Sequence, residues 1–473
     1  MRRSALVLGA VALLACSSDK KPAVAPASSS GVPTTTTTTV VTTTAPPTTA
    51  SPLSPIEGCP DPGPLAAPDP NRPRYIANAY VDVAGSSVSG SVAVTFTPDL
   101  PTDELVFRLW PNAPVLAASG VQEEVTSVEG EAGVALAFDQ PDATTVHVAL
   151  PVPLAAGDTT SVRLVFTLTV PRGNEDRVAR EGDTMRLGSF LPLLAWEPGV
   201  GWATDPPTTA HAEAATSPVA DYEVALNVPD GYDVLGSGAR GADGHWRATA
   251  VRDIAYSIGH FVLAEEDVGG VHITLGVDQS VGESPARYMD LITDAFRNYP
   301  ARLGAYPWPT YTAAVLPGFG GGIEFPTHVM HGAGSTTRSI VHEVAHQWFY
   351  SLVGNDQGRD PWLDEGLASY VEYVQVDSLA SRKAQHIPSD AVGRAGEPMS
   401  FWDQHEPSYF EGVYVQGAAA VARLGTVDEV DCALRQYVAH NAFRIATPAD
   451  LFAALSIVFP DAAERLAPYG LHP

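Results

Sequence analysis

Hydrophobic residues alternate with polar ones along much of the chain between residues 74 and 265. The two-residue period is clear from Val92 to Phe96, and it recurs from Val162 to Val170 and from Tyr222 to Val228. This period is typical of strands that bury one face. Proline and glycine separate the runs, so we predict a large antiparallel β domain whose faces pack on other layers.

The period changes to that of a helix after Pro285. One face of this predicted helix carries five apolar or aromatic residues, which are Tyr288, Leu291, Ile292, Ala295 and Tyr299. A turn and a strand from Tyr311 to Leu316 are predicted next. From Glu365 onward the chain is predicted to be mainly helical, with a helix from Val427 to His440 and a capped helix start at Thr447.

Two further helices are predicted on either side of residue 355. Helical spacing of apolar residues marks the first, at Ile340, Val341, Val344, Ala345, Trp348, Phe349 and Leu352. Its N-cap candidates are Ser335 to Thr337, and Gly354 with Asn355 predicts its end. Asp360 and Pro361 are typical of the first residues of the second helix. An antiparallel pair of helices would bring the residues after Pro361 back towards the first helix.

The first of these helices contains His342, Glu343 and His346, which form an H-E-x-x-H motif. Residues four apart lie on one face of a helix, so the two histidines can share one metal ion. Glu365 follows after eighteen residues and is the candidate third ligand. Two histidines and one glutamate with a position left for water suit a catalytic zinc, one ion per chain, with Glu343 aimed at that water. The alternative is a helix whose histidines bind no metal.

A glycine-rich segment, Gly318 to Gly322, precedes this motif. It lacks the G-K-[ST] ending of a phosphate-binding loop and has no basic partner nearby, which argues against a nucleotide. We predict instead that Gly321 and Gly322 let a substrate backbone lie against the following strand, by strand addition at a sheet edge. His328 and His331 have a spacing that suits no ligand pair, so we expect them to be structural.

These motifs together resemble the aminopeptidase N family of zinc metallopeptidases, the gluzincins. The H-E-x-x-H motif, eighteen residues and Glu365 within W-L-D-E-G-L-A match the family's zinc-binding pattern. Residues 321–326, G-G-I-E-F-P, resemble its G-x-M-E-N strand. Residues 414–418, Y-V-Q-G-A, resemble its Y-x-K-G-A segment.

The resemblance extends from about residue 70 to the C-terminus and implies an α+β multidomain fold. We expect an antiparallel, saddle-like β domain over residues 70–265 and a thermolysin-like, mainly helical zinc peptidase domain over residues 266–473. The β domain would have a scaffolding role. The large helical C-terminal domain of many family members is expected to be missing, which would leave the active site more open.

The resemblance also implies roles for three residues. Glu343 would be the general base, and the hydroxyl of Tyr414 would stabilise the oxyanion together with the metal. Glu324 would bind the free α-amine of a peptide substrate. Ile323 and Phe325 depart from the family, where Met and Asn are the commoner neighbours of this glutamate.

A second amine contact of the family often lies in a Gln-Cys-Gln segment of the β domain. That segment is absent, because no cysteine occurs between Cys59 and Cys432. Glu197 is the candidate replacement. Asp364 is adjacent to a ligand but is expected to point elsewhere on its helix, where at most it supports the ligands.

The N-terminus has the features of an export signal. Arg2 and Arg3 precede a short apolar run from Ala5 to Ala15, which is too short to span a bilayer stably. The following Cys16 completes a pattern that resembles a bacterial lipoprotein signal, and this implies a lipid on that cysteine. We expect a chain anchored outside the cytoplasm at the bacterial cell envelope; an ordinary secretory signal is the alternative.

Residues 17–69 are expected to be a disordered tether, because their Thr, Ser, Pro and Ala cannot bury enough apolar surface to offset ordering. If Cys16 is lipidated, Cys59 and Cys432 remain as a pair in an oxidising compartment. We predict a disulfide between them that pins the end of the tether to the catalytic domain. Two free thiols are the alternative.

The charge of the chain limits its partners. Its 27 basic and 54 acidic residues give a net charge of −27, which argues against nucleic acid and anionic membrane surfaces. We therefore expect peptide substrates, membrane attachment only through Cys16, and a monomer, although no sequence feature sets the oligomeric state. The expected function is that of an extracytoplasmic zinc metallopeptidase, most simply an aminopeptidase. The alternatives are an endopeptidase, an epoxide hydrolase as in one branch of the family, and a non-catalytic surface scaffold.

Overall fold

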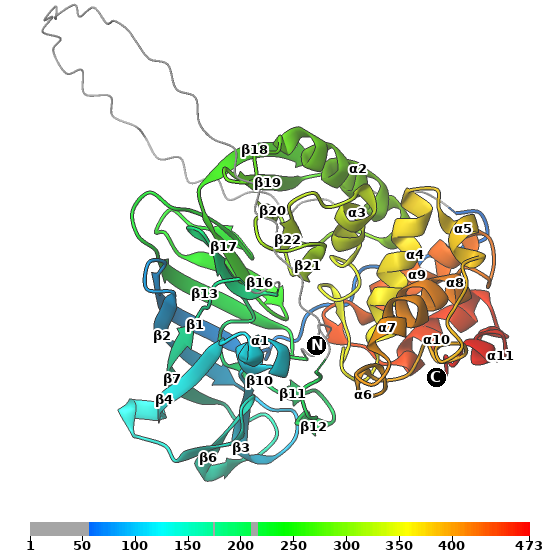
Figure 1. Cartoon of the computed structure of the whole chain (residues 1–473). Helices are drawn as coiled ribbons and strands as arrows, with labels where there is room; N and C mark the ends of the chain where they lie inside the picture. The colour runs from blue at the N-terminus through cyan, green and yellow to red at the C-terminus, as the bar shows by residue number, and fades with distance from the viewer. Residues whose placement is uncertain (1–55, 174–175, 210–215) are drawn as a thin grey trace, which may run out of the picture. The chain divides into compact units, whose positions relative to one another are not determined.

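The computed structural model describes residues 56–473 except 174–175 and 210–215 (Figure 1). The expected signal segment, Cys16 and most of the expected tether lie outside the described residues. All described residues belong to one compact unit. No helix among them is long and apolar enough to cross a membrane.

The largest layer of the N-terminal part is a seven-stranded sheet that contains all three runs of alternating residues. In sheet order its strands are β15 (Ala239–Arg240), β16 (Trp246–Val251), β13 (Ala220–Asn227), β1 (Arg74–Asp82), β2 (Ser87–Phe96), β7 (Thr160–Thr169) and β4 (Gln122–Glu129). Along β1 every second residue is buried. The prediction of antiparallel strands is confirmed except for one pair, because β1 and β13 run parallel.

Smaller sheets pack against this layer. One four-stranded sheet has the order β10 (Leu193–Leu194), β3 (Thr102–Arg108), β6 (Thr145–Leu154) and β5 (Phe138–Asp142). Another has the order β14 (Asp233–Gly236), β17 (Ala255–Gly259), β9 (Thr184–Gly188) and β8 (Val178–Glu181). The short elements of this region are β11 (Trp196–Glu197), β12 (Gly201–Trp202), η1 (Trp110–Asn112), α1 (Pro114–Ala118) and η2 (Glu131–Gly133).

A five-stranded sheet begins the catalytic part. Its order is β18 (Phe261–Val268), β19 (Val271–Asp278), β20 (Thr310–Leu316), β22 (His328–Gly332) and β21 (Gly322–Phe325). The expected domain boundary at residue 265 falls inside β18. Strand β21 lies at the edge of the sheet and pairs only with β22 among the described strands. Helix α2 (Pro285–Leu303) has the predicted extent, and it buries Tyr288, Ile292, Ala295 and Tyr299.

Helices make up the rest of the chain, as Figure 1 shows in yellow to red. The longer ones are α3 (Thr337–Ala345), α4 (Glu365–Gln375), α9 (Val427–Asn441) and α10 (Pro448–Val458). The shorter elements are β23 (Val353–Gly354), η3 (Pro361–Leu363), α5 (Leu379–Lys383), α6 (Met399–Trp402), α7 (Glu406–Tyr409), η4 (Phe410–Val415), α8 (Gln416–Val421), β24 (Arg444–Ile445), α11 (Ala462–Leu466) and η5 (Ala467–Tyr469).

Two predicted helix boundaries are wrong. Helix α3 has the expected N-cap at Thr336 but ends at Ala345 instead of reaching Leu352. The backbone turns after it, and Tyr350 has a φ of 106°, which no helix allows. Helix α4 begins at Glu365, capped by Asp364, because the residues after Asp360 form the short 3₁₀ turn η3.

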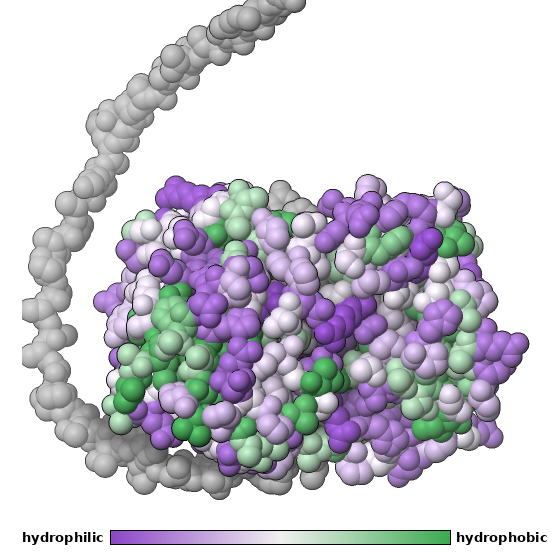
Figure 2. Space-filling model, turned by 90° about the horizontal axis from the view of Figure 1, so that it is seen from below, coloured by the Kyte–Doolittle hydropathy of each residue, from purple (hydrophilic) through white to green (hydrophobic). Residues whose placement is uncertain are grey.

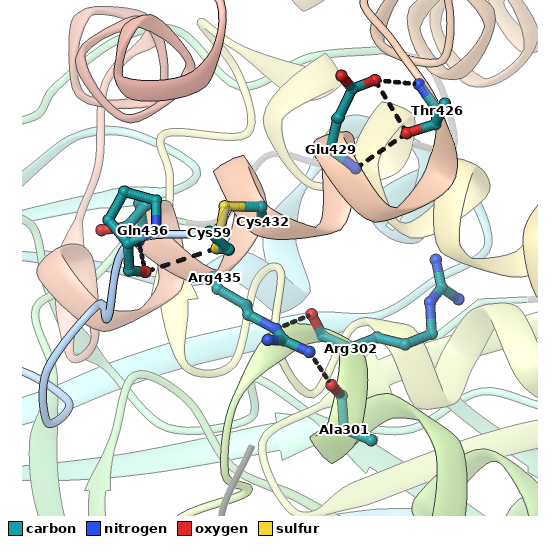
Figure 3. Close-up of a disulfide and its surroundings, with 9 residues drawn as sticks. Cys59, Ala301, Arg302, Thr426, Glu429, Cys432, Arg435 and Gln436 are labelled. Carbon is teal, nitrogen blue, oxygen red and sulfur yellow. Dashed lines mark hydrogen bonds between the residues drawn. A yellow bond between two sulfur atoms is a disulfide. The ribbon is translucent and has the colours of Figure 1, made fainter. Parts of the chain in front are cut away.

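The disulfide between Cys59 and Cys432 is confirmed (Figure 3). It attaches the end of the expected tether to α9, and Gln436 on the same helix donates a hydrogen bond to the carbonyl of Pro60 at 2.8 Å. Further along, the backbone N–H of Ala66 donates to the carbonyl of Ala439 at 2.8 Å. The described end of the expected tether therefore lies along α9.

One face of the molecule is drawn in Figure 2. Hydrophilic residues are spread over most of this face, and hydrophobic residues gather in separate patches. The mixture is that of a surface with many charged groups, in keeping with the 54 acidic residues of the chain.

Candidate metal centre and active site

Three predicted ligands converge at one point between α3 and α4. The Nε2 atoms of His342 and His346 lie 3.0 Å apart, and an oxygen of Glu365 lies 3.1 Å from the first and 3.5 Å from the second. All three residues are buried.

The distal nitrogen of each histidine is also held. The Nδ1 atom of His346 lies 3.0 Å from the carbonyl oxygen of Phe349, in the turn that follows α3. The Nδ1 atom of His342 lies 3.3 Å from a carboxylate oxygen of Glu372 on α4. The other oxygen of Glu372 accepts a hydrogen bond from Nε of Arg338 at 2.5 Å. Such contacts fix the ring orientation and leave Nε2 of each histidine for the metal.

Glu343 lies beside the metal ligands and against β21. Ligand atoms of Glu343, Glu324 and His346 all lie within 4.8 Å of one another. A Cβ atom on Gly322 would come within 2.3 Å of Cγ of Glu343, so only glycine allows this approach of the strand. Burial raises the pKa of Glu343 to about 8, against the opposing effect of the two histidines.

Glu324 is held at the edge strand by a short chain of polar contacts. Nε2 of Gln357 lies 3.4 Å from Glu324 and donates to Asp364 at 2.9 Å. The second oxygen of Asp364 accepts from the backbone N–H of Glu365, which caps α4. Burial raises the pKa of Asp364 to about 7, and the adjacent Glu365 adds to that shift. Asp364 thus faces Gln357 and away from the three ligands.

Tyr414 reaches the site from a π-helical turn, η4. Its ring stacks on the ring of His342, with centroids 5.7 Å apart and planes inclined by 20°. Helix α8, which continues η4, approaches α4 closely because glycines face each other, and a Cβ on Gly417 would lie 3.4 Å from Cα of Gly366. Single π-helical turns are frequent at functional sites, where they shift a side chain relative to a regular helix.

The structure brings together the predicted ligands, the general-base candidate, Tyr414, Glu324 and the two glycines, but not Glu197. A cleft of about 280 Å³ is lined by Gly321, Gly322, Glu324, His342, Glu343, His346, Glu365 and Tyr414. Glu197 does not line this cleft, and its carboxylate instead pairs with Nη1 of Arg359 at 3.1 Å. His328 and His331 are fully buried in β22 and do not line it either.

Four residues of the cleft were not recognised from the sequence, namely Arg338, Ser339, Glu372 and Phe410, and Thr336 was recognised only as a helix cap. Two of them had a usable signal. Arg338 lies four residues before His342, on the same helix face, and Glu372 lies seven residues, about two turns, after Glu365. Phe410 had no signal, because its place depends on the π-helical turn.

The fold and the site define a protein with a mononuclear zinc centre of the two-histidine, one-glutamate type. Residues 325–464 match the model of the Peptidase family M1 domain. The chain therefore carries a peptidase M1 domain, and the resemblance to zinc metallopeptidases of the aminopeptidase N family is confirmed.

Curated relatives match parts of the chain. Human aminopeptidase B is 25% identical over 281 residues, which cover 52% of this chain and 43% of that protein. Chicken aminopeptidase Ey is 30% identical over 147 residues, which cover 26% of this chain and 15% of that protein. The matched segments thus span less than half of the length of these relatives.

Solved structures share the fold over most of the chain. An M1 zinc metallopeptidase from Deinococcus radiodurans, a variant bound to a Tyr-Ser-Ala substrate, superposes with a TM-score of 0.62 at 20% identity. The match covers 85% of this chain and 95% of that one. The β sheets followed by a mainly helical part confirm the predicted α+β architecture.

Proposed function

We propose that this protein is a zinc-dependent aminopeptidase that releases N-terminal residues from peptides. The observation that carries the proposal is the place of Glu324. This buried carboxylate lies on the edge strand β21, beside the general-base candidate Glu343 and the ligand His346. A carboxylate there offers a charge-assisted hydrogen bond to an ammonium group in a partly dry site.

The edge position of β21 supports binding of an extended peptide. Only β22 pairs with this strand among the described ones, so its outer backbone groups can receive a substrate strand. Gly321 has a φ of 77°, and a Cβ atom on it would meet nothing within 4 Å, so space for a peptide remains open above it. An α-amine bound at Glu324 would fix the register of that peptide, with its first peptide bond beside the metal ligands.

His342, His346 and Glu365 would hold the zinc ion, which supplies Lewis-acid chemistry and acidifies a water molecule. The carboxylate of Glu343 is placed to accept a proton from that water and to deliver it to the leaving amine. The hydroxyl of Tyr414 is placed on the side of His342 to donate to the developing oxyanion, a contact typically worth about 3 kcal/mol.

The test compares an aminoacyl reporter with its N-acetylated form. We expect cleavage of the free-amine reporter alone, because acetylation removes the charge that Glu324 binds. Glu324→Ala should raise KM for the free-amine reporter at least 10-fold. Arg359→Gln is a control outside the cleft and should leave KM unchanged. Equal cleavage of free and acetylated reporters would refute amine binding and favour an endopeptidase.

We further propose that the enzyme acts outside the cytoplasm, attached through a lipid on Cys16. The N-terminal sequence pattern supports this location, and so does the disulfide, because disulfides persist in oxidising compartments. Cys16→Ser should move the protein from the membrane fraction to the soluble fraction. The same distribution for both proteins would contradict a lipid anchor.

A further inference from the structure

We propose that Arg338 binds the C-terminal carboxylate of the substrate, so that short peptides with a free C-terminus are the preferred class. The inference rests on the proposed aminopeptidase function. It concerns the C-terminal part of the same peptide substrate, which is released when the first peptide bond is cleaved. It is carried by the position of Arg338 along α3, by the charges of the cleft and by the nitrogens that this guanidinium leaves available.

Three cleft residues follow one another along a single face of α3 and its C-cap residue. Arg338, His342 and His346 are spaced by four residues, so each lies about one turn, roughly 5.4 Å, from the next. Glu324, the proposed amine contact, lies at the His346 end. Arg338 is therefore at the opposite end, beyond His342. A peptide that runs from Glu324 past the metal ligands continues towards Arg338.

The charges of the cleft are otherwise unfavourable for a peptide acid. Four carboxylates line it, those of Glu324, Glu343, Glu365 and Glu372. Arg338 is the sole lysine or arginine among the described residues that line it. An incoming carboxylate would be repelled by the four acids wherever the metal does not offset them, and it would be attracted at Arg338.

Arg338 is only partly used by the protein. Its Nε binds Glu372, and its guanidinium lies over the ring of Tyr373, 5.3 Å from the centroid. Its Nη1 and Nη2 atoms have no hydrogen-bond partner among the described residues, and its side chain is 34% exposed. The pair with Glu372 fixes the guanidinium plane, which leaves the fork of outer N–H groups for a carboxylate.

The distance between the metal ligands and Arg338 limits the length of a peptide that can contact both. An extended chain advances about 3.3–3.6 Å per residue, and Arg338 lies about one to two helical turns, roughly 5–11 Å, from the metal ligands along α3. One or two residues after the scissile bond span that distance. Dipeptides and tripeptides can therefore contact Glu324 with the amine and Arg338 with the carboxylate at the same time, whereas longer peptides cannot keep both contacts in one extended register.

The experiment measures binding in zinc-loaded protein that cannot turn over, the Glu343→Gln variant. The probes are a tripeptide with a free C-terminal carboxylate and the same tripeptide as its C-terminal amide. We expect the acid to bind at least 10-fold more tightly than the amide. Adding Arg338→Gln should abolish this difference by weakening the acid alone.

Arg382→Gln is the matched control. Arg382 also lies over the ring of Tyr373, at the same 5.3 Å, but it does not line the cleft. This variant should keep the preference for the acid. Zinc content is measured in each protein, because Arg338 also contacts the carboxylate beside His342.

Two results would overturn the proposal. One is equal affinity for acid and amide when Arg338 is present. The other is equal weakening of both peptides by Arg338→Gln, which would mean that the arginine acts only through Glu372. Failure of the proposed function is a separate result, namely no cleavage of any aminoacyl substrate by the unmodified enzyme, and the binding comparison is unaffected by it.

Discussion

At the scale of single residues, substitution of Glu343 should distinguish metal binding from catalysis. This glutamate lies beside the ligands but is not one of the three residues that converge on the metal position. We expect Glu343→Gln to retain one zinc per chain and to lose nearly all turnover, because the amide cannot accept a proton. Metal analysis and reporter kinetics on the same preparation check this prediction.

The contrasting variants are those of the ligands. His346→Ala removes one of three donors and should lose both zinc and activity. Chelation of the unmodified enzyme should abolish activity, and added zinc should restore it. Normal turnover by Glu343→Gln would contradict the role of this carboxylate as the base.

A second prediction at this scale concerns His331 and the dependence of protein stability on pH. This histidine is fully buried, and its two ring nitrogens have no hydrogen-bond partner among the described residues. Burial lowers its pKa from 6.5 to about 3, and burial also lowers that of His328 to about 3. Between these pH values the unfolded chain binds protons that the folded protein does not. The contribution of each histidine to stability is thus complete above pH 6.5 and declines as the pH falls towards 3.

We expect His331→Leu to remove one of these two protons. The free energy of unfolding should then fall less steeply with acidification, by about 1.4 kcal/mol per pH unit for one proton. Denaturant unfolding at several pH values between 3.5 and 7 checks the slope. An unchanged slope would mean that His331 titrates normally in the folded protein. Substitution of His328 should change the slope in the same way but should also lower stability at neutral pH, because its ring has hydrogen-bond partners in Ser257 and Thr312.

At the scale of elements, the fit of β21 against α3 positions the base. Gly322→Ala would place a methyl group 2.3 Å from Cγ of Glu343, so either the strand or the side chain must move. We expect kcat to fall about 100-fold or more, since displacement of about 1 Å at a reacting group is that costly, while zinc is retained. Gly320→Ala is the control, because no atom lies within 4 Å of a Cβ at that position. Equal activity of the two variants would contradict a tight fit.

The sequence predicted the elements better than their ends. The apolar period from Ile340 to Leu352 predicted a single helix, yet α3 ends at Ala345. Trp348, Phe349 and Leu352 are nevertheless fully buried. The spacing of apolar residues indicates which residues face the core. It does not indicate where the helix ends, because a turn can bury the same residues as a helix. The turn itself depends on contacts with remote residues, such as the pairing of Val353 with Arg444.

The site was predicted where one motif fixes the geometry. His342, His346 and Glu343 follow from helical spacing, Glu365 was proposed from its place eighteen residues further on, and Glu324 followed from the resemblance. Glu197 shows the limit of predicting site residues from the sequence. Its place in the β domain could not indicate that its carboxylate pairs with Arg359. The role that we assign to Arg338 depends on the cleft as a whole, with its charges and its direction, which appear only in three dimensions.

At the scale of the whole molecule, the disulfide closes a loop of 373 residues. Removing it by Cys59→Ser with Cys432→Ser should lower the free energy of unfolding by up to about 5 kcal/mol, because the unfolded chain regains the freedom that the loop had removed. Activity at low temperature should be unchanged, since neither cysteine lines the cleft. Denaturant unfolding of both proteins tests this, and equal stability would contradict it.

The same bond decides how a pulling force travels through the molecule. A force applied to the chain ahead of Cys59 passes through the disulfide into α9 and bypasses the strands that follow in sequence. The residues enclosed by the disulfide cannot be extended by the force while the bond is intact. At about 3.5 Å per residue, their fully extended length would be about 1,300 Å. If the expected lipid anchors the enzyme by its N-terminus, a force on that anchor enters the folded part at α9 and not at the first strand of the β layers.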